Sequence, residues 1–207
     1  MYGNAYLAGT IFQNASFGNG ITINAGNFEQ LFIARYDSSG NCVWAKKGGN
    51  PSVPNIIGGI ATDINGYSIL IGSFKGTANF SPYNLSSSGQ EDACFVKYSP
   101  SGTCQYALKG SGAGIEYGYS GAWLPSNEFV LSGSFQNTAT FGSITINTPA
   151  ATTYANYIGL VTGATAGLNT MELGELTYGP NPVTNTFYIN TENLMGIKTV
   201  EVFNSMG

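Results

Sequence analysis

Three related copies of one pattern dominate this sequence, and they constrain what the chain can fold into. Each copy contains a glycine that a phenylalanine follows eight residues later. These pairs are Gly9 with Phe17, Gly72 with Phe80 and Gly133 with Phe141. The glycines lie 63 and then 61 residues apart. Self-similarity at a fixed period is typical of propellers, solenoids and arrays, in which each unit buries its apolar face against a neighbour.

The second half of the pattern is also repeated between the first two copies. Residues 32–48 match residues 94–110 at a constant offset of 62. Both segments carry a basic residue (Arg35, Lys97), a turn that contains glycine, and then an aromatic residue (Trp44, Tyr106). The third copy keeps a strand-like segment at 157–161 but has neither the basic nor the aromatic residue. Terminal repeats are commonly atypical because they cap the array.

The local sequence predicts short strands joined by tight turns. Tyr, Phe, Thr and β-branched residues suit a pleated surface, and the segments Asp37–Gly40 and Asp63–Gly66 are strong hairpin signals. In such turns an aspartate starts the turn and a glycine accepts a positive φ. We therefore predict an all-β chain in which residues 1–161 form three propeller-like blades of about four antiparallel strands each, a partial propeller. The blades span about 1–50, 56–112 and 117–161.

Composition excludes several classes of partner. Charged residues make up only 9% of the chain, the net charge is −4, and the seven Lys and Arg residues are scattered. Nucleic-acid binding requires a basic surface that neutralises phosphates, so it is disfavoured. No apolar run approaches the roughly 18 residues of a membrane-spanning helix. We predict neither nucleic acid as a partner nor a transmembrane segment.

The end of the chain has a different character. Residues 162–177 are rich in Gly, Ala and Thr and are predicted to be a linker. They are followed by Gly179-Pro180-Asn181-Pro182-Val183, a short strand, and a final turn that ends at Gly207. Because this tail does not follow the period of the repeats, we predict that 178–207 is a second, truncated domain.

The central copy resembles the repeat of bacterial seven-bladed β-propellers. The matching residues are Asp63, Gly66, Gly72, Phe74, Phe80, Phe95-Val96-Lys97, Gly102 and Tyr106-Ala107, where the family has Trp-Ala; the first copy keeps Trp44-Ala45. The resemblance covers residues 3–165. It implies a propeller repeat of the kind found in secreted and surface proteins.

The tail resembles the type A C-terminal sorting domain of type IX secretion cargo, a small β-sandwich-type domain. The resemblance lies in Gly179–Val183, the strand Phe187–Ile189 and the segment Val200–Gly207. The family normally continues beyond that last glycine with a further pair of strands. The resemblance implies that a Gram-negative cell exports the protein with the type IX machinery, to the outer-membrane surface or into the medium.

Catalytic and metal chemistry find little support in the residues. The sequence contains no histidine, which removes Ser-His-Asp and Cys-His arrangements and the commonest zinc and haem ligands. Glu91-Asp92 is the only adjacent acidic pair; we expect it to decorate a turn rather than to form the facing carboxylates of a glycosidase. The Asp63 turn starts like a calcium loop but has Phe74 where an EF-hand has its ligating glutamate. We predict no catalytic residue, no cofactor and no metal.

The cysteines Cys42, Cys94 and Cys104 have no metal-binding spacing. Antiparallel pairing about Pro100-Ser101 would set Cys94 opposite Ala107 and Cys104 opposite Lys97, a geometry that does not favour a disulfide. We expect the thiols to behave as small buried apolar groups.

Aromatic and basic residues that recur offer two interpretations. Trp44, Tyr106 and Trp123 could stack on sugar rings, although the repeat position of the first two favours a core between blades. Arg35 and Lys97 occupy a fixed strand position, and we expect them to be outward cations that discourage sheet-to-sheet contacts.

These observations favour a non-enzymatic repeat module of an exported surface or secreted bacterial protein, which serves in adhesion or in binding carbohydrate or protein. Two alternatives stay open: an accessory domain of a secreted hydrolase whose catalytic part lies upstream, and a purely structural surface protein. Closed propellers have at least about four blades. Three blades leave two faces uncovered, so we expect the array to open, self-associate or aggregate unless upstream blades are restored.

Overall fold

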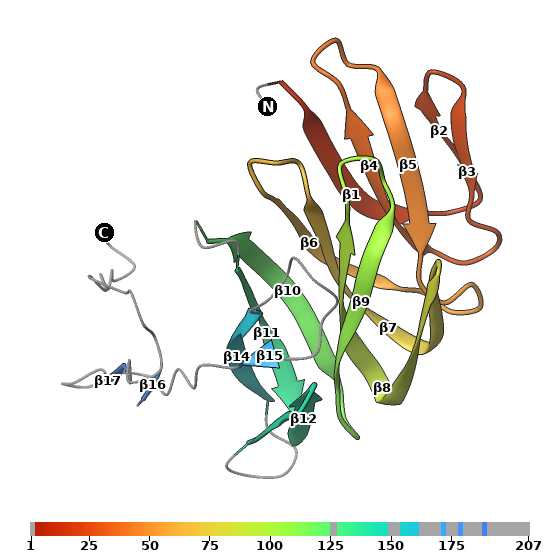
Figure 1. The fold of residues 1–207 in the computed structure, drawn as a ribbon. Coiled ribbons are helices and arrows are strands. Elements are labelled where there is room, and N and C mark those ends of the chain that lie inside the picture. Colours follow the sequence, from red (N-terminus) through yellow and green to blue (C-terminus); the bar gives the residue numbers. More distant parts are fainter. Residues whose placement is uncertain are drawn as a thin grey trace, which may run out of the picture.

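A computed structural model describes residues 3–124, 128–148 and 154–161, together with the backbone of 171–172, 178–179 and 188–189. Every regular element in this part of the chain is a β-strand, which confirms the predicted all-β class (Figure 1). Among the described residues there is no helix of the length and apolarity that crossing a membrane would require.

The strands follow the three copies, and we call the groups the first, second and third unit. The first unit consists of β1 (Ala5–Ile11), β2 (Asn14–Gly18), β3 (Ile21–Asn24), β4 (Gln30–Tyr36) and β5 (Cys42–Gly48). The second unit consists of β6 (Ile56–Thr62), β7 (Ser68–Phe80), β8 (Tyr83–Tyr98) and β9 (Cys104–Ser111). The third unit consists of β10 (Glu116–Trp123), β11 (Phe129–Gln136), β12 (Thr138–Phe141), β13 (Ile144–Asn147), β14 (Tyr154–Val161) and β15 (Met171–Glu172).

All three units place their main strands in the same order and the same register. The strand orders are β1-β4-β5, β6-β7-β8-β9 and β10-β11-β14-β15. The equivalent pairs β1–β4, β7–β8 and β11–β14 are antiparallel. The repeated glycine always faces the same position of the next strand: Gly9 opposite Phe32, Gly72 opposite Cys94, Gly133 opposite Tyr157. The β4–β5 and β8–β9 pairs also share a bulge at equivalent residues. Figure 1 shows the three groups in succession, with the first at the upper right, the second in the middle and the third at the lower left.

The units are not three independent four-stranded blades, because strands of the third unit belong to the sheet of the second. Strand β12 pairs with β9 of the second unit, so the middle sheet has six strands in the order β13-β12-β9-β8-β7-β6. In the first unit the hairpin β2–β3 forms a two-stranded sheet of its own. In the second and third units, the hairpin that carries the repeated phenylalanine forms backbone hydrogen bonds with the unit before it. A contact between that phenylalanine ring and a glycine explains this pairing.

Phenylalanine from one unit lies on glycine from the previous unit at both junctions. A Cβ atom placed on Gly48 would lie 2.2 Å from the Phe80 ring, and one on Gly110 would lie 2.0 Å from the Phe141 ring. Both rings are fully buried. The backbone beside each contact is also paired, Asn79 with Gly49 and Thr140 with Ser111. Only glycine leaves room for this approach, which explains why residues 48 and 110 match in the sequence.

The predicted hairpin turns are present. The glycines Gly40, Gly66 and Gly102 have φ of 80°, 85° and 80°. Each donates its N–H to the carbonyl three residues earlier, at 3.0, 3.1 and 2.9 Å. This is a type I turn followed by a left-handed glycine and a bulge, a common hairpin connection.

That turn geometry corrects the expected cysteine pairing. Cys94 lies opposite Lys109 and Cys104 opposite Tyr98, because the connection spans residues 99–103 and the register shifts between Lys97 and Tyr98. All three thiols are buried and unpaired, as expected.

Each junction is filled by apolar side chains from two units. The first core combines Leu31, Ile33 and Trp44 of the first unit with Leu70, Phe74, Ala78, Phe80, Cys94, Val96, Tyr98 and Cys104 of the second. The second combines Ile69, Ile71, Ala93 and Phe95 with Phe129, Leu131, Phe135, Ala139, Phe141, Tyr157 and Val161 of the third. The first unit buries one face of its sheet beneath its own β2–β3 hairpin. Each unit nevertheless shares at least one core with a neighbour, so the units stabilise one another.

Most of the predicted linker and of the predicted second domain lies outside the described residues. The expected linker, 162–177, lies outside the described residues apart from β15, whose backbone pairs with β14. In the expected second domain, β16 (Tyr178–Gly179) pairs with β17 (Tyr188–Ile189).

The ring-on-glycine contact yields a first prediction. Gly110→Ala should lower the free energy of unfolding by roughly 2–4 kcal/mol, because the added methyl group overlaps the Phe141 ring and forces a rearrangement of the core. Urea unfolding measures this change. In the double variant with Phe141→Leu the cost of Gly110→Ala should shrink by at least about 1 kcal/mol. Additive costs would show that the two residues do not touch.

Candidate functional site

The repeated basic residues lie inside the junctions, where each meets the following unit. Arg35 and Lys97 stand opposite Trp44 and Tyr106 in their hairpins. Arg35 Nη1 donates to the carbonyl oxygen of Pro100 at 2.8 Å, and Trp44 Nε1 donates to the same oxygen at 2.9 Å. The cation and the indole of the first unit thus hold the 99–102 turn of the second.

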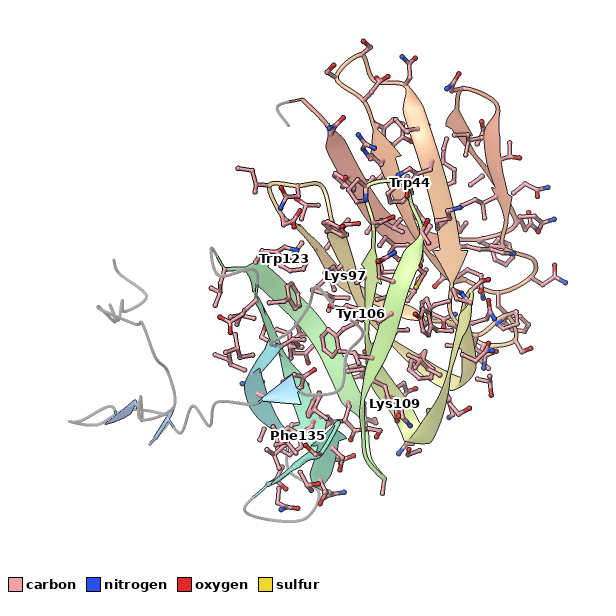
Figure 2. All side chains as sticks on the ribbon, in the orientation of Figure 1. Trp44, Lys97, Tyr106, Lys109, Trp123 and Phe135 are labelled. Atoms are coloured by element: carbon pink, nitrogen blue, oxygen red, sulfur yellow. The ribbon has the colours of Figure 1, made fainter. Side chains whose placement is uncertain are left out.

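Lys97 is enclosed by aromatic rings. Its Nζ lies 4.8 Å from the centroid of the Tyr67 ring, 4.9 Å from that of Trp123 and 5.7 Å from that of Tyr106. Figure 2 shows Lys97, Tyr106 and Trp123 close together between β9 and β10. Burial lowers the pKa of Lys97, and the charge of Asp63 acts in the opposite direction. The expectation of an outward cation is therefore wrong: cation–π attraction to three rings holds the ammonium in the junction.

The aromatic residues considered for sugar stacking occupy the same junctions. Trp44 and Tyr106 are buried, and the Trp44 ring is 2.8 Å from where a Cβ on Gly102 would lie. Trp123 is partly buried and meets Phe129 edge-on, with ring centroids 5.5 Å apart. The structure brings Tyr106 and Trp123 together around Lys97, while Trp44 lies at the other junction.

A pair of buried carboxyl groups lies at the second junction, and sequence reasoning identified only half of it. Asp92 and Glu116 are both fully buried. Asp92 Oδ2 is 3.4 Å from Lys109 Nζ, and the Ser88 N–H donates to both Asp92 oxygens at 3.2 Å. Asp92 therefore does not decorate a turn; it points inward from the middle of β8. Glu116 carries no local motif that could have revealed it.

The first junction has amides at the equivalent positions. Gln30, Asn50 and Asn55 correspond to Asp92, Gly112 and Glu116. Asn55 Nδ2 donates to the Glu29 carbonyl at 2.8 Å, and Asn55 Oδ1 accepts from the Asn50 N–H at 2.8 Å. Gln30 Nε2 donates to the Asn50 carbonyl. This network is neutral and satisfied. Comparing the copies position by position is the one sequence signal that could have led to Glu116.

Glu116 is much less well satisfied than Asn55. Neither of its carboxyl oxygens makes a well-formed hydrogen bond in the described part of the chain. Burial raises the pKa of Glu116 to about 8, and the charge of Asp92 adds to the rise, while the Gly112 amide and Lys109 oppose it. Burial likewise raises the pKa of Asp92. Because substrate cannot reach fully buried oxygens, this pair does not have the geometry of a glycosidase site.

A groove opens at the first junction, between β3, β5 and the segment after β7. Its volume is about 650 Å³. Its walls include the polar side chains of Asn24, Gln30, Lys47 and Asn79, with Ile23 and Ala45 as apolar neighbours. The Lys47 ammonium also donates to the Asn24 carbonyl oxygen. The groove joins segments of two copies, so no single stretch of sequence indicates it.

The predicted sorting motif lies almost wholly outside the described residues. Pro180, Asn181, Pro182, Val183 and Gly207 are not described, and Gly179 is described only as backbone paired with Tyr188.

No protein family model and no curated protein matches this chain.

The buried carboxyl pair yields a second prediction. Between pH of about 4.5 and 8 the unfolded chain has released the Glu116 proton and the folded chain still holds it. The folded state binds more protons in this window, so its stability falls as the pH rises. Glu116→Gln stays neutral, and its Tm at pH 8 should exceed that of the parent by several degrees, since 1 kcal/mol corresponds to roughly 2–4 °C at this chain length.

Calorimetry at pH 5 and pH 8 checks this expectation. The exposed carboxylate Glu29 supplies the control, because Glu29→Gln should leave the difference in Tm between pH 5 and pH 8 as it is in the parent. If Glu116→Gln also left that difference in Tm as in the parent, Glu116 would not be the group that titrates.

Proposed function

We propose that this chain is a non-enzymatic, propeller-like repeat module of an exported bacterial surface or secreted protein, and that it binds a carbohydrate or protein ligand. The observation that carries the binding part is the groove at the first junction. At this groove, polar side chains of two units converge around an open volume. Pockets of about 300–1,000 Å³ are the usual size for small-ligand sites.

The chemistry of the groove favours an oligosaccharide with an acidic group. Asn24 and Asn79 carry exposed amides, which offer donors and acceptors to hydroxyl groups. Lys47 adds a cation that suits a carboxylate or sulfate. The repeated rings Trp44 and Tyr106 are buried in the junctions, so hydrogen bonds rather than ring stacking would hold the sugar.

Export is the second part of the proposal, and sequence alone supports it. The residues Gly179-Pro180-Asn181-Pro182-Val183 follow the expected linker and resemble a type A sorting domain. On this basis the partner is the type IX secretion machinery, and the location is the outer-membrane surface or the medium.

A purely structural role is the second candidate. It is favoured by one observation: the repeated cations and rings, Arg35, Lys97, Trp44 and Tyr106, are all engaged between units. A chain whose distinctive residues serve its own junctions needs no ligand to explain them.

A glycan array probed with the whole chain tests the proposal, followed by calorimetric titration of the strongest acidic glycan. Lys47→Gln should weaken that binding about tenfold, because it removes one of the two lysine charges, Lys46 and Lys47, that line the groove. Lys75→Gln is the matched control: Lys75 is exposed and does not line the groove. Absence of glycan binding, or equal losses in both variants, would favour the structural role.

A further inference from the structure

The front of the first unit carries an apolar residue that both later units bury. Leu7 corresponds to Leu70 and Leu131 in the repeat. Leu7 is 50% exposed, whereas Leu70 and Leu131 are 0% exposed. Leu70 packs in the core that the second unit shares with the first, and Leu131 in the core that the third shares with the second. Leu7 thus occupies a position that a preceding unit covers elsewhere in this chain.

The hairpin β2–β3 covers only part of that front. Phe17 packs against Phe32 of its own unit, with ring centroids 5.1 Å apart, instead of lying on a glycine of another unit. Phe32, Ala34 and Cys42 are buried beneath this hairpin. Leu7 remains open beside it.

The Asp37–Gly40 turn of the first unit also lacks the contact that the equivalent turn of the second unit makes with the unit before it. Gly102 of the second unit lies against the Trp44 ring of the first. Its equivalent, Gly40, has no atom within 4 Å of where a Cβ would stand. We call Leu7 together with the Asp37–Gly40 turn the front face.

The back of the third unit shows the complementary exposure. Ile158 corresponds to Ile33 and Phe95, which pack against the following unit. Ile33 and Phe95 are 0% and 1% exposed, whereas Ile158 is 44% exposed. Val130 and Leu160 lie partly exposed on the strands that carry this face. We call Val130, Ile158 and Leu160 the back face.

We propose that this chain associates head to tail with a second copy of itself, the front face of one chain packing on the back face of the next. The two faces are the parts that stay exposed at the outer sides of the first and third units, which correspond to the two halves of a junction that the chain already forms twice within itself. That repetition identifies the occupant: a sheet of the same repeat, with matching spacing of apolar side chains. The contact is heterologous, since different surfaces meet, and it forms rings or open chains according to the rotation between copies.

The heterologous character makes the proposal sharply testable. Leu7→Asp blocks the front face and Ile158→Asp blocks the back face. Size exclusion with light scattering at about 100 μM should give oligomers for the parent chain and a monomer of 21.7 kDa for each variant. An equimolar mixture of the two variants should give a dimer of twice that mass, because one intact front meets one intact back.

Ile64→Asp is the control, since Ile64 is a strongly exposed apolar residue of a turn and belongs to neither face. It should associate like the parent. Circular dichroism verifies the fold of each variant, and Leu7→Ser with Ile158→Ser replaces any aspartate variant that unfolds.

Three outcomes would overturn the proposal. A monomeric parent at 100 μM would show that the faces are covered within one chain, for example by residues 162–207. Variants that still associate would place the contact elsewhere. A mixture that stays monomeric, when the single variants are monomeric and folded, would show a symmetric contact between identical faces.

Discussion

The contact between a phenylalanine of one unit and a glycine of the unit before it determines how this chain is assembled. Phe80 lies on Gly48 and Phe141 on Gly110, and the backbone beside each ring pairs across the junction. A ring that approaches the backbone this closely excludes any side chain larger than hydrogen. The contact therefore fixes the separation and register of neighbouring sheets, and the apolar faces meet as a consequence. Isolated, each unit would expose half of a core.

The two junctions share this geometry but differ in their polar chemistry. The first contains the neutral network of Gln30, Asn50 and Asn55, and the second contains Asp92 and Glu116 beside Lys109. Two buried carboxyl groups with one cation leave an uncompensated charge, which a proton on Glu116 removes. The same apolar frame thus supports one junction with a neutral amide network and one for which the raised pKa of Glu116 predicts a stability that falls as the pH rises.

Much of the fold could be predicted from the sequence, because period and turn chemistry are local signals. The glycine-to-phenylalanine spacing identified the units, and Asp63–Gly66 identified a hairpin that the structure contains. The pairing of β12 with β9 of the unit before it could not be predicted, because it depends on the contact between Phe141 and Gly110 of another unit. The fixed strand position of Lys97 predicts an outward cation that discourages sheet-to-sheet contacts. The rings that enclose it come from Tyr67, Tyr106 and Trp123, which no local pattern connects. The groove and Glu116 were missed for the same reason.

The assembly of the units determines which residues contact a neighbouring unit and which stay exposed. Residues that repeat with the period, such as Arg35 with Lys97 and Trp44 with Tyr106, face the neighbouring unit and are occupied there. A repeated position in such a chain therefore usually faces a neighbouring unit. Repeated residues that no unit covers are the ones left to serve a ligand or another copy. Lys47 repeats as Lys109 but lines the groove, and Leu7 repeats as Leu70 and Leu131 but is exposed. Recognition by this chain is thus expected where a repeated side chain stays uncovered, and its stability where a neighbouring unit covers it.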